Sequence, residues 1–217
     1  MVKFGHVYLS WRKGIGYPRH LVGRIKRSAT KGTTFQYFPK RIREAEKDGF
    51  APYTEFPLID KVYGEGVLES FGQRIIKSER ADSKPFYDFW AIDLKRKSDP
   101  LYMLSMTQGW IPTDNFEFLA DFQPTKDLYF ITDIAGLTEK ALEPGLVKVG
   151  DVLEYKHKQS HPKDGYAVEV YKDNLMIGYI KKVHSKVFYE SKSQLKLVVK
   201  SIDQNGVIKR IFVAVSF

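Results

Sequence analysis

The chain has 217 residues, of which 43% are hydrophobic and 14% aromatic, and this composition is too apolar for a disordered protein. It has no cysteine, which excludes disulfides, thiolate catalysis and cysteine-ligated zinc. No apolar run approaches the roughly 20 residues that cross a bilayer, and residues 1–14 lack the long apolar core of a secretion signal, so we expect a cytoplasmic protein without membrane association. The net charge of +9 suits a polyanionic partner and, equally well, a solvated basic face that keeps the protein soluble.

The positive charge is densest near the N-terminus. Residues 19–43 hold eight Lys or Arg and no acid. Each cation that meets a phosphate releases condensed counterions, so such a run favours nucleic acid without requiring it.

The first half of the chain alternates short strands with helices. Residues 6–11 predict a strand, residues 20–27 follow after a turn, and residues 33–38 have the period of two of a half-buried strand. Pro39 opens a predicted helix that Gly49 terminates. Further helical segments are predicted at residues 67–76, 84–94 and 99–110, the last opened by Ser98, Asp99 and Pro100.

The second half is predicted to be almost entirely β. Short strands separated by polar turns indicate a small antiparallel barrel. The fold class is therefore α+β, with a mixed N-terminal subdomain at 1–122 and a C-terminal β-barrel at 127–217, divided near Gln123–Lys126. The predicted strands are 128–134, 151–158, 166–171, 175–180, 195–202 and 208–217.

Residues 133–187 resemble a HIRAN domain. The features that carry the resemblance keep the family's order and spacing, and the last of them is a Gly-Tyr-Ile motif at the end of a predicted strand. They are Gly136-Leu137, Gly150-Asp151, His161-Pro162-Lys163-Asp164, Ala167-Val168 and Gly178-Tyr179-Ile180.

The resemblance implies a small barrel related to oligonucleotide-binding folds that captures the 3′ end of single-stranded DNA. The family's DNA binders carry aromatic residues beside the Gly-Leu and in the loop, where this chain has Thr138-Glu139 and Lys163. Asp164 either shapes a ligand loop or only satisfies backbone amides in its turn. The predicted nucleic-acid contacts are His161, Lys163, Asp164, Tyr166, Lys181, Lys182 and Lys186.

Residues 7–119 resemble the N-terminal subdomain of HipA-type kinases. The matching features include Val22-Gly23, the Phe35-x-Tyr37 strand, Pro57-Leu58 and the segment around Phe71. The resemblance implies a module that docks on a protein partner, and as a separate chain an antitoxin that approaches the active site of a HipA-type serine/threonine kinase. The predicted partner contacts are Ile76, Lys77, Ser78, Glu79 and Trp110, although Ile75 and Ile76 could equally be core residues of a plain connector.

No pattern in the chain indicates an enzyme. His157 and His161 are four residues apart, but the surrounding pattern is strand and loop, so a helical metal site does not apply. There is no phosphate-binding Gly-rich loop with Lys-Ser/Thr and no nucleophile elbow. We therefore expect a non-enzymatic protein without cofactor or metal. It contacts DNA through the HIRAN-like half and a protein through the first half, or it is an antitoxin-like kinase inhibitor of the toxin–antitoxin type with little DNA affinity.

Overall fold

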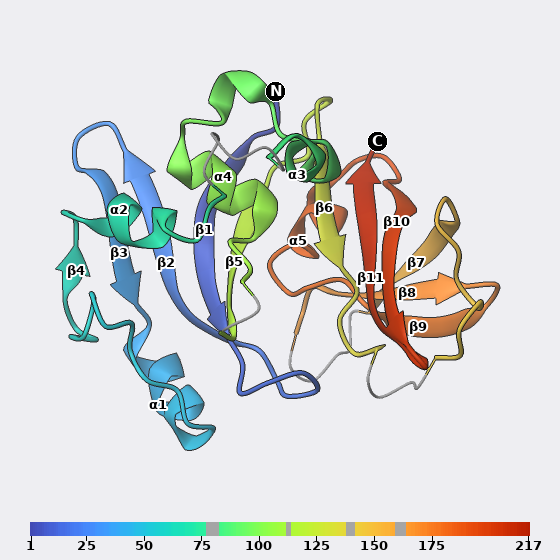
Figure 1. Cartoon of the computed structure of the whole chain (residues 1–217), viewed down its shortest axis with the longest axis horizontal. Helices are drawn as coiled ribbons and strands as arrows, with labels where there is room; N and C mark the ends of the chain where they lie inside the picture. Colours follow the sequence, from blue (N-terminus) through green and yellow to red (C-terminus); the bar gives the residue numbers. More distant parts are fainter. Residues whose placement is uncertain (77–82, 112–113, 138–141, 159–163) are drawn as a thin grey trace. The chain divides into compact units, whose positions relative to one another are not determined.

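The chain forms two compact units. The structure is a computed structural model that describes residues 1–76, 83–111, 114–137, 142–158 and 164–217. The N-terminal unit is Phe4–Ala120, and the C-terminal unit combines Asp121–Phe217 with Met1–Lys3. Figure 1 labels their elements.

The N-terminal unit is built on a five-stranded sheet with strand order β4-β3-β2-β1-β5. β1 pairs antiparallel with β2, and β2 with β3, as expected of consecutive strands joined by turns. Alternation along these strands buries Val7, Leu9 and Ile25 completely on one face, and leaves Tyr8 and its cross-strand neighbour Arg24 on the other. The strands are β1 (Phe4–Trp11), β2 (His20–Ser28), β3 (Gly32–Tyr37), β4 (Val62–Tyr63) and β5 (Phe116–Phe122).

Two predicted helix starts are confirmed. Pro39 is the first residue of α1 (Pro39–Lys47), where its missing N–H costs no hydrogen bond. The carboxylate of Asp99 caps α4 (Pro100–Thr107) by accepting the N–H groups of Leu101 and Tyr102 at 3.1 and 3.3 Å.

Aromatic side chains join α2 (Val67–Gly72) to the buried face of the sheet. The ring of Phe71 lies 5.1 Å from that of Phe35 on β3 and 5.0 Å from that of Phe118 on β5. In Figure 1, α2 and α4 lie over the same face of this sheet. The opposite face is therefore left without these two helices.

The helical segments predicted at residues 67–76 and 84–94 are shorter in the structure. α2 ends at Gly72 rather than at residue 76, in keeping with the low helix propensity of glycine. α3 (Ser83–Trp90) ends before Ala91, whose φ of 51° is incompatible with a right-handed helix, and the predicted remainder contains a 3₁₀ turn, η1 (Leu94–Arg96). No helix in the described parts of the chain is long and apolar enough to cross a membrane.

The C-terminal unit is a six-stranded sheet with strand order β6-β11-β10-β7-β8-β9. All six strands predicted for this half are present, within a few residues of their expected ends. A short helix, α5 (Lys186–Glu190), follows β9 and was not predicted. The strands are β6 (Tyr129–Asp133), β7 (Val152–Lys158), β8 (Ala167–Lys172), β9 (Leu175–Tyr179), β10 (Lys196–Asn205) and β11 (Val207–Ser216).

The predicted closed barrel is wrong, because the edge strands β6 and β9 do not form a ladder within the described residues. They meet at one isolated bridge, in which Ala135 and Tyr179 exchange two backbone hydrogen bonds of 2.7 and 2.9 Å. Gly178 permits this approach: a Cβ there would lie 2.5 Å from the Ala135 carbonyl oxygen and 2.5 Å from a methyl group of Ile134. The glycine of the Gly-Tyr-Ile motif thus has a steric role.

Candidate nucleic-acid interface

The turn before β8 is organised by Asp164. Its carboxylate accepts the N–H of Tyr166 at 3.0 Å, and its carbonyl accepts the N–H of Ala167 at 3.2 Å. Aspartate favours such turns because its side chain satisfies nearby backbone amides. The predicted structural role of Asp164 is therefore confirmed, and a ligand role stays a prediction. Its neighbour Tyr166 is 49% exposed.

Four aromatic side chains from three elements lie in a row beside this turn. Tyr166 meets Tyr189 of α5 edge to face, with ring centroids 5.4 Å apart. Tyr189 stacks on His157 of β7 at 4.2 Å and 23°, and His157 lies 5.8 Å from Tyr155 on the same strand. We call Tyr166, Tyr189, His157 and Tyr155 the aromatic row.

Local structure explains why these rings meet. Tyr155 and His157 are two residues apart on β7, so both point to the same face of the sheet. The Tyr189 hydroxyl donates to the carbonyl oxygen of Ala167 at 2.8 Å, which anchors α5 beside the start of β8. Partial burial raises the pKa of Tyr189, and the Asp164 carboxylate raises it further, so this phenol stays neutral.

Two members of the aromatic row are accessible to solvent. His157 and Tyr166 are exposed, whereas Tyr155 and Tyr189 are partly buried. Exposed aromatic rings are the platform on which unpaired bases stack, and each such contact contributes roughly 1–3 kcal/mol.

The cations near the row come from α5 and the turn before it. Lys182 is exposed, and Lys186 lies one helical turn before Tyr189. The Lys186 ammonium lies 3.2 Å from Glu190 and 3.4 Å from Asp121. Burial alone would lower the pKa of Lys186, but these two carboxylates outweigh it and hold the pKa above its usual range. Lys186 is therefore charged at neutral pH.

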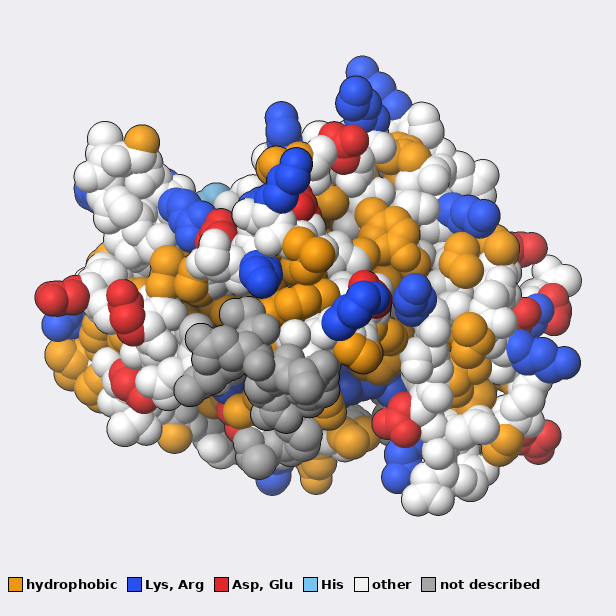
Figure 2. All heavy atoms as spheres, turned by 45° about the horizontal axis from the view of Figure 1, so that its top comes forward, with side chains coloured by type: hydrophobic (Ala, Val, Ile, Leu, Met, Phe, Trp, Pro, Cys, Tyr) orange, Lys and Arg blue, Asp and Glu red, His pale blue; other side chains and the backbone are white. Residues whose placement is uncertain are grey.

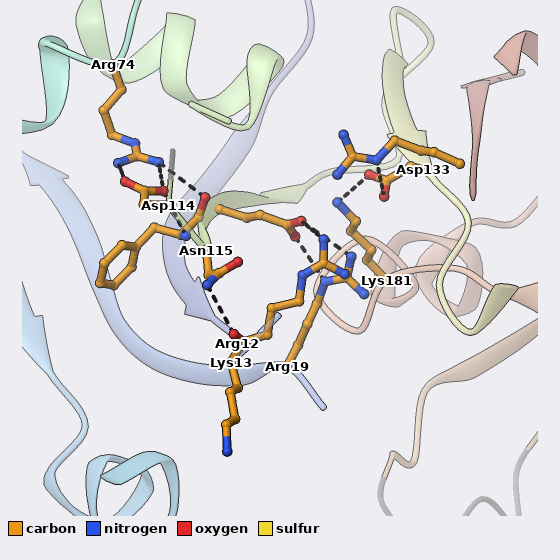
Figure 3. A network of polar contacts seen from close by, with 11 residues as sticks. Arg12, Lys13, Arg19, Arg74, Asp114, Asn115, Asp133 and Lys181 are labelled. Atoms are coloured by element: carbon orange, nitrogen blue, oxygen red, sulfur yellow. Dashed lines mark hydrogen bonds and ion pairs between the residues drawn. The ribbon is translucent and has the colours of Figure 1, made fainter. Parts of the chain in front are cut away.

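The predicted surface role of Lys181 is wrong. Its side chain is 1% exposed, and its ammonium is paired with the carboxylate of Asp133, as Figure 3 shows. Arg210 adds a second cation, with its Nε 3.5 Å from the same carboxylate. Lys182 lies in the turn that follows and is exposed, so the basic pair of the sequence divides into one buried and one surface cation.

The net charge does not by itself mark a binding surface. On the face shown in Figure 2, Lys and Arg side chains are interspersed with acidic and hydrophobic ones instead of forming one patch. On β7, Lys156 and Lys158 point to the face opposite His157, where Lys158 pairs with Glu169 at 3.4 Å. Side-chain placement, and not composition, therefore has to identify the interface.

Several predicted contacts lie outside the described residues. These are His161 and Lys163 of the loop before β8, and Lys77, Ser78 and Glu79 of the predicted partner loop. Of the other two partner residues, Ile76 is partly exposed and Trp110 is 43% exposed, as expected for the tryptophan. The antitoxin-like alternative stays a prediction.

Trp110 is held in place by a buried arginine. Arg74 forms a two-pronged ion pair with Asp114, including a 2.7 Å bond from Nη2 (Figure 3). Its Nε also donates to the Gly109 carbonyl at 2.8 Å. Gly109 has φ +50°, and a Cβ on it would lie 2.8 Å from Leu104 and from Phe118. The turn that presents Trp110 is thus tightly determined.

Three members of the aromatic row, Tyr155, His157 and Tyr189, were not predicted from the sequence. His157 was weighed only as a metal ligand, and Tyr189 lies on a helix that was not predicted. The available signal was the i, i+2 spacing of Tyr155 and His157 in a strand that leads directly into the predicted ligand loop. Nothing local in the sequence connects Tyr189 to that strand.

Comparisons with known proteins assign no family to the chain. No family model and no curated protein sequence matches it. Among solved structures, the crystal structure of the HIRAN domain of human HLTF is similar at 17% sequence identity and a TM-score of 0.32, and the match covers 40% of this chain and 74% of that one. A likeness at this TM-score carries neither fold nor function to this chain. For the predicted HIRAN resemblance, the comparisons found this partial similarity alone. For the predicted HipA resemblance they found no match.

Proposed function

We propose that this protein is non-enzymatic and binds single-stranded nucleic acid through the aromatic row of its C-terminal unit. The observation that carries the proposal is the stack of Tyr189 on His157, 4.2 Å between ring centroids, beside the exposed ring of Tyr166. The rings of Tyr166, Tyr189 and His157 thus lie together beside the turn that Asp164 organises.

The row compensates for aromatic residues that the sequence lacks elsewhere. Residues 138, 139 and 163 are Thr, Glu and Lys, so none of them can stack on a base. His157 and Tyr189 supply rings from β7 and α5 instead. Stacking of this kind tolerates any base, because every base has a π face.

The same geometry favours single strands over duplexes. A base stacks on a protein ring only if its own faces are open, which paired bases in a duplex are not. The exposed Lys182 would hold a phosphate, and for a single strand the observed binding constant falls with salt at about 0.7 per phosphate contact on a log–log scale. We therefore expect binding that weakens steeply with salt.

The decisive experiment is fluorescence anisotropy of the full chain with labelled oligonucleotides over a salt series. The ligands are a single strand with a free 3′ end, the same strand with a blocked 3′ end, and a duplex. The double variant Tyr189→Ala/His157→Ala removes the stack. The control variant is Tyr171→Ala, which also removes a tyrosine ring but from β8, on the face of the sheet opposite His157.

We expect the wild type to prefer single strands and the double variant to lose at least tenfold in affinity, while Tyr171→Ala stays near wild type. A free-end preference that disappears with the double variant would place the strand end at the row. Equal affinity of all three proteins, or tighter binding to duplex, would overturn the proposal.

A further inference from the structure

The N-terminal sheet has one face that α2 and α4 do not cover. Its central residues form a cross-strand row in which Tyr8 pairs with Arg24, Arg24 with Gln36, and Gln36 with Val62. Val62 is 57% exposed, and the other three are partly exposed. We call this surface the open sheet face; it also includes exposed Lys26, which pairs with Thr34 on β3.

Aromatic rings and cations interleave along one side of this face. The ring of Tyr8 lies 6.2 Å from that of His6 and 6.3 Å from that of Phe38, which precedes α1. The guanidinium of exposed Arg41 sits 5.2 Å from the centre of the Phe38 ring. Cation–π contacts of this kind pre-order an arginine on an aromatic surface without neutralising its charge.

The cations of this face lack acidic partners within the described part of the chain. The sequence has no Asp or Glu before Glu44, so β1, β2 and β3 contain no acid at all. None of the described acids makes an ion pair with Arg24, Lys26 or Arg41.

Other cations of the same basic run are neutralised. Arg19 bonds Glu117, with Nε 3.0 Å from Oε2, and Arg27 forms a two-pronged pair with Asp99 at 2.7 and 2.9 Å. The fold thus divides the run into cations that hold the unit together and cations that leave the open sheet face positive.

We propose that the open sheet face is a second surface for single-stranded nucleic acid. Bases stack on Tyr8 and Phe38, and phosphates bind Arg24, Lys26 and Arg41. A sheet face with rings between cations fits a strand whose bases are unpaired and whose backbone is anionic, since stacking and phosphate contacts are then made together. The surface is independent of the aromatic row, because its residues all belong to the other unit.

The test uses the full chain in the Tyr189→Ala/His157→Ala background, so that residual binding reports on the N-terminal unit. The charge variant is Arg24→Gln/Lys26→Gln, and the ring variant is Tyr8→Leu, which keeps an apolar side chain. The matched control is Lys95→Gln/Lys97→Gln, which removes two exposed cations from the same unit. The probe is labelled oligo-dT, measured by anisotropy from low to physiological salt, with thermal unfolding to check each fold.

We expect Arg24→Gln/Lys26→Gln to bind at least tenfold more weakly and to flatten the log–log salt slope by about 1.4, two phosphate contacts at about 0.7 each. Tyr8→Leu is expected to lose about tenfold with an unchanged slope, and the control to keep both affinity and slope. If the control loses as much as the charge variant, the affinity is generic charge and the proposal fails. If neither variant changes binding, nucleic acid is the wrong partner for this face, and a protein partner takes its place.

Discussion

The ammonium of Lys181 lies against the carboxylate of Asp133 inside the C-terminal unit, with 1% and 5% of the two side chains exposed. Asp133 ends β6 and Lys181 follows β9, so the pair links the two edge strands close to the Ala135–Tyr179 bridge. Among the described residues, the two edges of the C-terminal sheet are therefore joined by the bridge and the buried ion pair and not by a ladder.

Lys181→Met is expected to destabilise the protein strongly. It leaves the Asp133 carboxylate buried without its lysine partner, and breaking a buried pair by removing one partner costs about 3–5 kcal/mol. Urea unfolding followed by circular dichroism measures the loss. Lys182→Met, one residue further along and exposed, should unfold near the wild-type urea concentration; equal midpoints for the two variants would contradict the buried role.

The aromatic row predicts a contrast between two substitutions of one residue. Tyr189→Phe keeps the ring on His157 and loses only the hydroxyl that bonds Ala167, so single-strand affinity should stay within about threefold of wild type. Tyr189→Ala removes the ring and should lose about tenfold, which corresponds to about 1.4 kcal/mol of stacking. Anisotropy at fixed low salt compares them, and a Phe variant as weak as the Ala variant would show that the hydroxyl, not the ring, matters.

Gly178→Ala is expected to separate the edge strands. The new Cβ would meet the Ala135 carbonyl at 2.5 Å, a backbone atom that cannot swing away. Overpacking of this kind costs roughly 1–3 kcal/mol. Gly165→Ala is the matched control, since nothing lies within 4 Å of its Cβ position. Gly178→Ala should unfold at a lower urea concentration than Gly165→Ala. Equal urea midpoints for the two variants would show that the bridge tolerates a side chain at residue 178.

The ion pair between Arg27 and Asp99 predicts a pH dependence of the N-terminal unit. Burial alone would raise the pKa of Asp99, but bonds from Arg27 and from the N–H groups of Tyr102 and Leu101 outweigh it, so the pKa lies below its usual range. A carboxyl group with a lowered folded-state pKa stabilises the fold above its unfolded pKa of about 3.9, and this contribution is lost as the pH falls through the folded value.

Asp99→Asn isolates this contribution, because asparagine still caps α4 but cannot pair with Arg27. Above about pH 5 the wild type should be more stable by about 1 kcal/mol, and the difference should vanish toward pH 2–3. Urea unfolding followed by tryptophan fluorescence reports on this unit, which holds all three tryptophans. A stability difference between wild type and Asp99→Asn that grows as the pH falls would contradict this prediction.

Several features were predictable because they depend on residues close in sequence. Pro39 and Asp99 mark helix starts through their own backbone and side-chain chemistry, and alternation identified the strands of the C-terminal unit. Several elements were not predicted, and β5 and α5 show two of the reasons. β5 has buried residues on both faces and so lacks alternation, and α5 has five residues, too few for a helical period to be visible.

The sequence by itself determined the α+β class, most of the strands, and the starts of α1 and α4. Only the tertiary structure decided which of two adjacent lysines is buried, which arginines of the basic run find acids, and which rings meet in the aromatic row. The physical reason is that a propensity acts through neighbours along the chain, whereas burial, ion pairing and stacking depend on residues that folding brings from other strands. Lys181 is an internal cation because Asp133 faces it, and Tyr189 belongs to a surface row because β7 carries His157 beneath it.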